Sequence, residues 1–121
     1  MIKYHKTNDN KIIAELIDKK FILSQVQDAL DLMGNLGPFD CNMIIIHESN
    51  LHKDFFNLKT RLAGDILQKF SNYRVKCAIV GDFSKYESKS LQDFIRESNR
   101  RGMIFFTDKL ETALMRFTDN E

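Results

Sequence analysis

The chain has 121 residues, the length of one domain, and 43% of them are hydrophobic and 29% charged. This composition is typical of a globular protein that buries a core without metal or disulfide support. The 18 basic and 17 acidic side chains are balanced in both halves of the chain, which excludes the basic patch of a nucleic-acid binder. No apolar run approaches the roughly 20 residues that span a bilayer, so we expect residues 1–121 to form one cytoplasmic domain.

The first 40 residues predict a β-hairpin followed by a helix. A polar cluster at residues 7–10 separates two short strand-like segments, as in a hairpin. Ser24 and Gln27 have the spacing of a capping box, which predicts a helix beginning there. Gly34 and the pair Gly37–Pro38 are signals that end this helix.

From residue 43 onward, short apolar segments alternate with longer segments of helical periodicity. Met43–Ile46 is apolar at every position, which is typical of a strand covered on both faces in a parallel sheet. Residues 75–80 and 103–106 are predicted to form two further strands of this kind. Apolar residues recurring every three or four positions predict helices from Asp54 to Phe70, from Ser88 or Ser90 to about Gly102, and from Asp108 to Phe117.

The predicted order is two strands, then a helix, then three strand–helix pairs. It indicates a layered α/β domain with a mixed sheet of about five strands, in which parallel crossover units follow the hairpin. A doubly wound, flavodoxin-like sheet is the alternative.

Polar side chains follow two of the predicted parallel strands, at the edge where ligands bind in open α/β sheets. His47 and Glu48 follow one strand, and Asp82 and Ser84 follow the next. We expect a ligand site, if the protein has one, to include these four residues, with His47 or Asp82 as a base. His52 lies five positions after His47, so the spacing does not favour a zinc site made with Glu48. The sequence predicts neither a metal nor a cofactor.

The loop that begins at Gly81 has a glycine after a strand and a Lys-Ser pair before a helix, as phosphate loops do. Tyr86 takes the place of the second Walker glycine and Lys89 falls too late, so ATP hydrolysis is not supported. A small anion could still bind at the start of the predicted helix. The candidate anion-binding residues are Ser84, Ser88, Lys89 and Ser90.

No sequence motif favours nucleophilic catalysis. Cys41 and Cys77 have no activating neighbour, no metal-ligand spacing and no disulfide framework, which fits a reducing compartment. A triad of Ser84, His47 and Asp82 lacks the Gly-x-Ser-x-Gly turn.

Most of the ten phenylalanines fall on predicted apolar faces, so we assign them to the core. Phe83 and Tyr86 lie in a predicted loop and are expected to form an exposed aromatic patch for a partner.

Four segments resemble the bacterial domain-of-unknown-function family 4180, and the similarity covers nearly the whole chain. The segments are Ile44–Glu48, Asp54–Thr60, Ile79–Ser84 and Ser88–Asn99. This resemblance implies membership of the family but brings no activity and no site residues.

Residues 11–117 also resemble STAS-type domains, the fold of anti-anti-sigma factors, in their order of strands and helices. In that family the long helix opens Asp-Ser-Ser-Gly-Leu, and one serine is phosphorylated to switch partner binding. Asp54 and Leu58 match the motif, but Phe55 and Phe56 replace both serines. The resemblance therefore implies a partner-binding domain without the phosphoswitch.

These observations favour a non-enzymatic cytoplasmic regulatory or protein-interaction module, with Asp54, Phe83 and Tyr86 as partner-binding residues. The alternative is a small-ligand or anion-binding protein, or a minor enzyme, and a homodimer is a third possibility. The candidate ligand-binding residues are His47, Glu48, Asp82, Ser84, Ser88 and Lys89.

Overall fold

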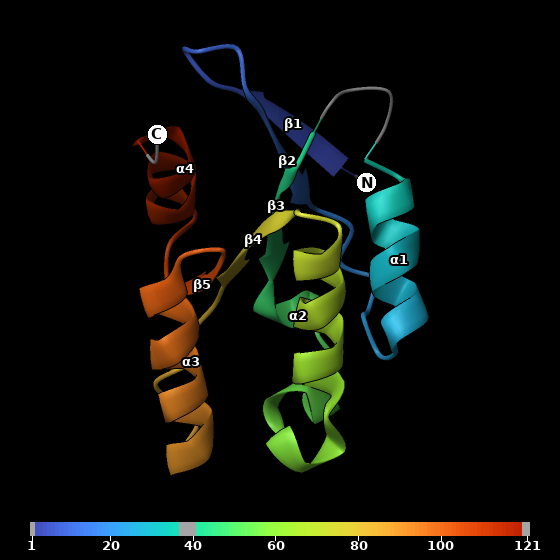
Figure 1. Cartoon of the computed structure of the whole chain (residues 1–121), viewed down its shortest axis with the longest axis vertical. Coiled ribbons are helices and arrows are strands. Elements are labelled where there is room, and N and C mark those ends of the chain that lie inside the picture. The colour runs from blue at the N-terminus through green and yellow to red at the C-terminus, as the bar shows by residue number, and fades with distance from the viewer. Residues whose placement is uncertain (1, 37–40, 120–121) are drawn as a thin grey trace.

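A computed structural model describes residues 2–36 and 41–119, which form one five-stranded sheet with helices on both faces (Figure 1). The strands are β1 (Ile2–Lys6), β2 (Ile12–Leu16), β3 (Met43–His47), β4 (Lys76–Val80) and β5 (Ile104–Thr107). The helices are α1 (Val26–Gly34), α2 (Leu62–Asn72), α3 (Lys89–Arg101) and α4 (Leu110–Asp119). Three short 3₁₀ turns lie between β3 and α2: η1 (Glu48–Asn50), η2 (Lys53–Phe56) and η3 (Leu58–Thr60).

The strands lie in the sheet in the order in which they occur along the chain, β1-β2-β3-β4-β5. β1 pairs antiparallel with β2, and the remaining neighbours are parallel. The predicted mixed α/β sheet is confirmed. The flavodoxin-like alternative is wrong, because its strand order reverses at a switch point that this sheet lacks.

The two faces of the sheet are covered unequally. The helices α1, α2 and α3 share one large apolar core with one face of the sheet (Figure 1). On the opposite face α4 builds a smaller core through Ala113 and Phe117, against residues of β2 to β5. The prediction that phenylalanines form the core is confirmed for those that are almost fully buried, Phe55, Phe70, Phe105 and Phe117.

The predicted helix over residues 54–70 is wrong in its first half, because local side-chain hydrogen bonds break it. The Thr60 hydroxyl donates to the backbone oxygens of Asp54 (2.6 Å) and Asn57 (2.8 Å). Arg61 then takes a left-handed conformation with φ of 65°, and α2 begins only after it. Short polar side chains that bond nearby backbone compete with a helix in this way.

The helix caps are partly those expected. α3 begins after Ser88, whose hydroxyl accepts from the backbone N–H of Leu91, and ends at Gly102, as predicted. For α1 the capping box lies one residue later than expected. Gln25 is the N-cap instead of Ser24, and Asp28 takes the third helical position instead of Gln27. The predicted stop at Gly37–Pro38 lies outside the described residues. None of the helices described is long and apolar enough to cross a membrane.

Candidate functional site

Glu48 joins the carboxyl ends of β3 and β4. Its Oε1 accepts from the backbone N–H of Asp82 (3.1 Å), and its Oε2 accepts from the Tyr86 hydroxyl (2.6 Å) and pairs with Lys85 Nζ (2.7 Å). Burial of the carboxyl opposes ionisation, but the hydrogen bonds from Lys85 and Tyr86 outweigh it and lower the pKa of Glu48. A carboxylate predicted to face a ligand therefore holds a loop in place.

The aromatic side chains of this loop pack inward. Phe83 is only 9% exposed and contacts Phe106 edge-to-face, with ring centroids 5.2 Å apart. Tyr86 is half-buried and stacks on Phe56 at 4.6 Å. The expected exposed patch is therefore wrong for Phe83, because the loop folds back onto the end of the sheet. Burial and the neighbouring Glu48 carboxylate raise the pKa of Tyr86, so it remains a hydrogen-bond donor.

The other candidates near this loop are engaged with their neighbours in sequence. Asp82 Oδ1 accepts from the backbone N–H (3.1 Å) and the hydroxyl (2.6 Å) of Ser84. Ser88 caps α3, and Lys89 Nζ lies 3.0 Å from Asp93 Oδ2. The candidate anion-binding groups thus stabilise a turn and the first turn of a helix.

His47 turns away from this group and meets a residue that the sequence analysis missed. Its Nε2 lies 2.7 Å from Glu15 Oε2, while His5 Nε2 lies 2.8 Å from Glu15 Oε1. One carboxylate, only 5% exposed, is therefore shared by imidazoles from β1 and β3, on either side of β2. Its burial would raise the pKa, but the hydrogen bonds from His47 and His5 more than offset this and lower the pKa of Glu15.

A hollow of about 230 Å³ lies next to this cluster, at the carboxyl ends of β2 and β3. Its polar lining consists of Glu15, His47, Lys19, Ser49 and Asn50. The predicted edge of the sheet thus has a cavity, but the four strand-end candidates do not meet in it. Of those four, only His47 lines it. Asp82 and Ser84 lie in the loop after β4, and Glu48, at the start of η1, is hydrogen-bonded to that loop.

Asp54 lies in η2, where its backbone N–H donates to His52 Nδ1 (3.1 Å) and its side chain is half-exposed. Within residues 2–36 and 41–119, no three His, Cys, Asp or Glu side chains are placed to hold a metal ion. Cys77 is fully buried, and this burial raises the pKa of its thiol, so the nucleophilic thiolate is disfavoured.

The family model described as Domain of unknown function (DUF4180) matches residues 8–117. The chain belongs to the DUF4180 family. No curated protein and no solved structure matches the chain. The span matched to DUF4180 contains Glu15, His47 and the whole Glu48 network, whereas His5 lies before it.

Proposed function

We propose that this DUF4180 domain is a non-enzymatic regulatory module that binds a protein partner. The partner would bind the strand-end surface, which we define as residues 48–60 and 81–88. The observation that carries the proposal is the Glu48 network: the charged groups at the strand ends fix two loops against each other instead of facing a reaction centre. A surface that is already ordered loses less conformational entropy on binding.

Exposed and half-exposed side chains of both loops suit this role. Lys53 and Lys85 are exposed, and Asp54 and the half-buried Tyr86 lie beside them in the same two segments. Tyrosine is enriched among residues that dominate binding energies, and charged rims set the association rate. A substitution at Phe83 cannot test binding, because the loss of this buried ring would also destabilise the core.

The resemblance to STAS-type domains supports the same proposal. Phe55, at the first of the two serine positions, is completely buried, and Phe56 packs on Tyr86. We therefore propose a STAS-like partner-binding domain that no phosphoserine switches. The free cysteines Cys41 and Cys77 support a cytoplasmic location.

Reversing one exposed charge tests the proposal. The full chain would be cross-linked in lysate of the organism that makes it, and captured proteins quantified by mass spectrometry. Lys53→Glu changes the strand-end surface, and Lys6→Glu is the matched control at the opposite edge of the sheet, where β1 ends. We expect a protein captured by the wild type and the control to be depleted several-fold by Lys53→Glu. Equal capture by all three proteins contradicts this surface.

A second candidate function, small-ligand binding, is favoured by the hollow beside Glu15 and His47. Thermal-shift measurements with nucleotides, sugar phosphates and divalent metals test it, because a ligand that binds the folded state raises the melting temperature. A shift that His47→Gln abolishes supports this function, and no shift with any compound counts against it.

A further inference from the structure

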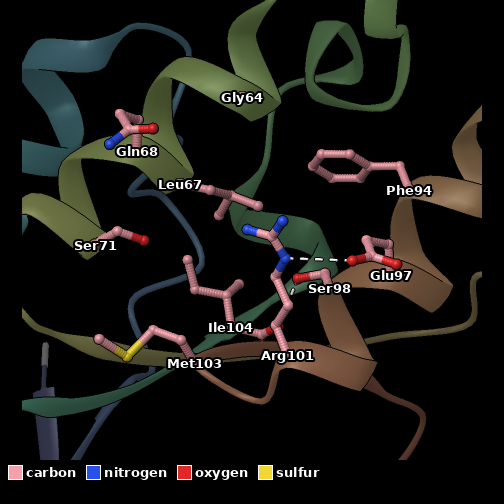
Figure 2. A pocket seen from close by; sticks show the side chains of 10 residues that line it. All are labelled: Gly64, Leu67, Gln68, Ser71, Phe94, Glu97, Ser98, Arg101, Met103 and Ile104. Atoms are coloured by element: carbon pink, nitrogen blue, oxygen red, sulfur yellow. Dashed lines mark hydrogen bonds and ion pairs between the residues drawn. The ribbon is translucent and has the colours of Figure 1, made fainter.

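A groove of about 450 Å³ lies between α2 and α3 (Figure 2). None of the described residues that line it belongs to the strand-end surface. It runs beside the second half of α3 and reaches the start of β5, which is the opposite edge of the sheet. Its floor is apolar and consists of Leu67, Phe94, Met103 and Ile104. Cavities of roughly 300–1,000 Å³ with an apolar lining and a few polar groups are typical of small-molecule sites.

Gly64 of α2 lines this groove and carries no side chain that could fill it. A Cβ added at Gly64 would meet no atom within 4 Å, so the space beside it is empty. A methyl group at this helical position would fit without displacing its neighbours, and a longer side chain such as leucine is expected to extend over the groove that Gly64 lines.

One cation lies at the rim of the groove, where the Arg101 side chain is 77% exposed. Figure 2 shows the Arg101 side chain crossing the groove, with its guanidinium end toward Leu67. Arg101 Nε donates to Glu97 Oε2 (3.3 Å), and in the described part of the chain its two terminal nitrogens have no hydrogen bond. These two nitrogens are the pair with which arginine binds a carboxylate in a bidentate manner.

Glu97 does not neutralise this cation by itself, because it is shared. Arg100 donates three hydrogen bonds to the two oxygens of Glu97, at 2.8 to 3.2 Å. These bonds and the one from Arg101 lower the pKa of Glu97, so the carboxylate stays ionised at neutral pH. Two arginines and one glutamate leave one positive charge at the rim of the groove.

We propose that the groove binds a small carboxylic acid with an apolar chain or ring. The carboxylate accepts hydrogen bonds from the terminal nitrogens of Arg101, and the apolar body lies on Leu67, Phe94 and Ile104. The proposal goes beyond the partner-binding function, since it concerns a different surface and a different class of ligand.

Octanoate and 1-octanol are suitable probes, because they share an apolar chain and differ in charge. In an NMR titration of the full chain, octanoate should shift the amide resonances of Gly64, Ser98 and Arg101. We expect octanol to bind about tenfold more weakly, as the loss of a charge-assisted hydrogen-bonded pair predicts. Arg101→Gln should weaken octanoate by a similar factor and leave octanol unchanged.

Filling the groove is the second arm of the test. Gly64→Leu should abolish binding of both probes, while Gly34→Leu, in α1, should bind them as the wild type does. Gly34 is the matched control because a Cβ there also meets no atom within 4 Å. Circular dichroism establishes that both variants are folded. The proposal is overturned if octanoate shifts resonances elsewhere only, if Gly64→Leu binds normally, or if Arg101→Gln loses no affinity.

Discussion

At the scale of single residues, Glu15 tolerates little change, because its buried carboxylate accepts hydrogen bonds from two imidazoles. Glu15→Gln keeps the shape of the side chain but sets an amide N–H against one imidazole N–H. An unpaired buried polar group costs about 1–3 kcal/mol, so we expect the free energy of unfolding to fall by that amount. Urea denaturation at neutral pH measures it.

The control for this experiment is Glu87→Gln, which removes an exposed carboxylate. Surface substitutions of this kind usually change stability by less than about 0.5 kcal/mol. Equal stability of the two variants would show that the two histidines do not depend on Glu15.

Gly81 is the second residue with a sharp structural requirement. A Cβ at Gly81 would lie 2.5 Å from Glu48 Cβ and 2.7 Å from Glu48 Oε1. Gly81→Ala should therefore push Glu48 away from its loop and destabilise the protein by about 1–3 kcal/mol. Gly64→Ala, in open space within α2, should instead be neutral or stabilise by up to about 1 kcal/mol. Thermal unfolding measures the melting temperatures of the two variants. A lower melting temperature for Gly64→Ala than for Gly81→Ala would refute the role of Gly81.

At the scale of the helices, sequence patterns predicted where the helices lie but not how the two ends of α2 form. Gly102 marks the end of α3 in the sequence and takes a φ of 83° there. α2 ends at Asn72, and Arg74, two residues further on, takes the left-handed conformation with a φ of 58°, which the sequence does not mark. Likewise, the polar residues Asn57 and Thr60 fit the helical pattern over 54–70, and only their competing hydrogen bonds break it.

The left-handed residue Arg74, just after α2, is a position where glycine should stabilise the protein. The N–H of Arg74 donates to Ser71 O and the N–H of Val75 to Phe70 O, which is the Schellman pattern that favours glycine. Arg74→Gly removes the left-handed strain of a side chain, although it adds freedom to the unfolded chain. We expect a net stabilisation of about 0.5–1 kcal/mol by urea denaturation. Arg74→Ala retains the strain and should give no gain, so a gain with alanine would exclude this explanation.

For the whole molecule, the sequence predicted the sheet and the polar edge better than the contacts made there. Periodicity carries the order of elements, since it records which faces are buried. The partners of Glu15 are 10 and 32 positions away, and those of Glu48 are 34 to 38 away. The sequence indicates the Glu15 cluster only through an acidic residue inside the apolar strand Ile12–Leu16, which predicts a buried ion pair or hydrogen bond but not which residues are its partners. Long-range pairing therefore decides which strand-end residues remain free.

These two glutamates also set how the whole fold responds to acid. The folded state lowers the pKa of Glu15 and of Glu48 from an ordinary value of 4.5. As the pH falls, the unfolded chain takes up these protons first, so the stabilisation is complete above about pH 4.5 and is lost as the pH falls through the folded values. We expect the free energy of unfolding to decrease below that pH, and the double variant with Glu15→Gln and Glu48→Gln to decrease less steeply.

Urea denaturation at a series of pH values, in about 0.5 M salt, separates these two groups from the surface carboxylates. The pKa values of Asp93 and Glu97 are also lowered, but both belong to exposed ion pairs on α3. Salt screens such pairs far more than the buried Glu15. If the wild type and the double variant show the same acid dependence in salt, the charges that stabilise this fold lie on its surface and not at the ends of β2 and β3.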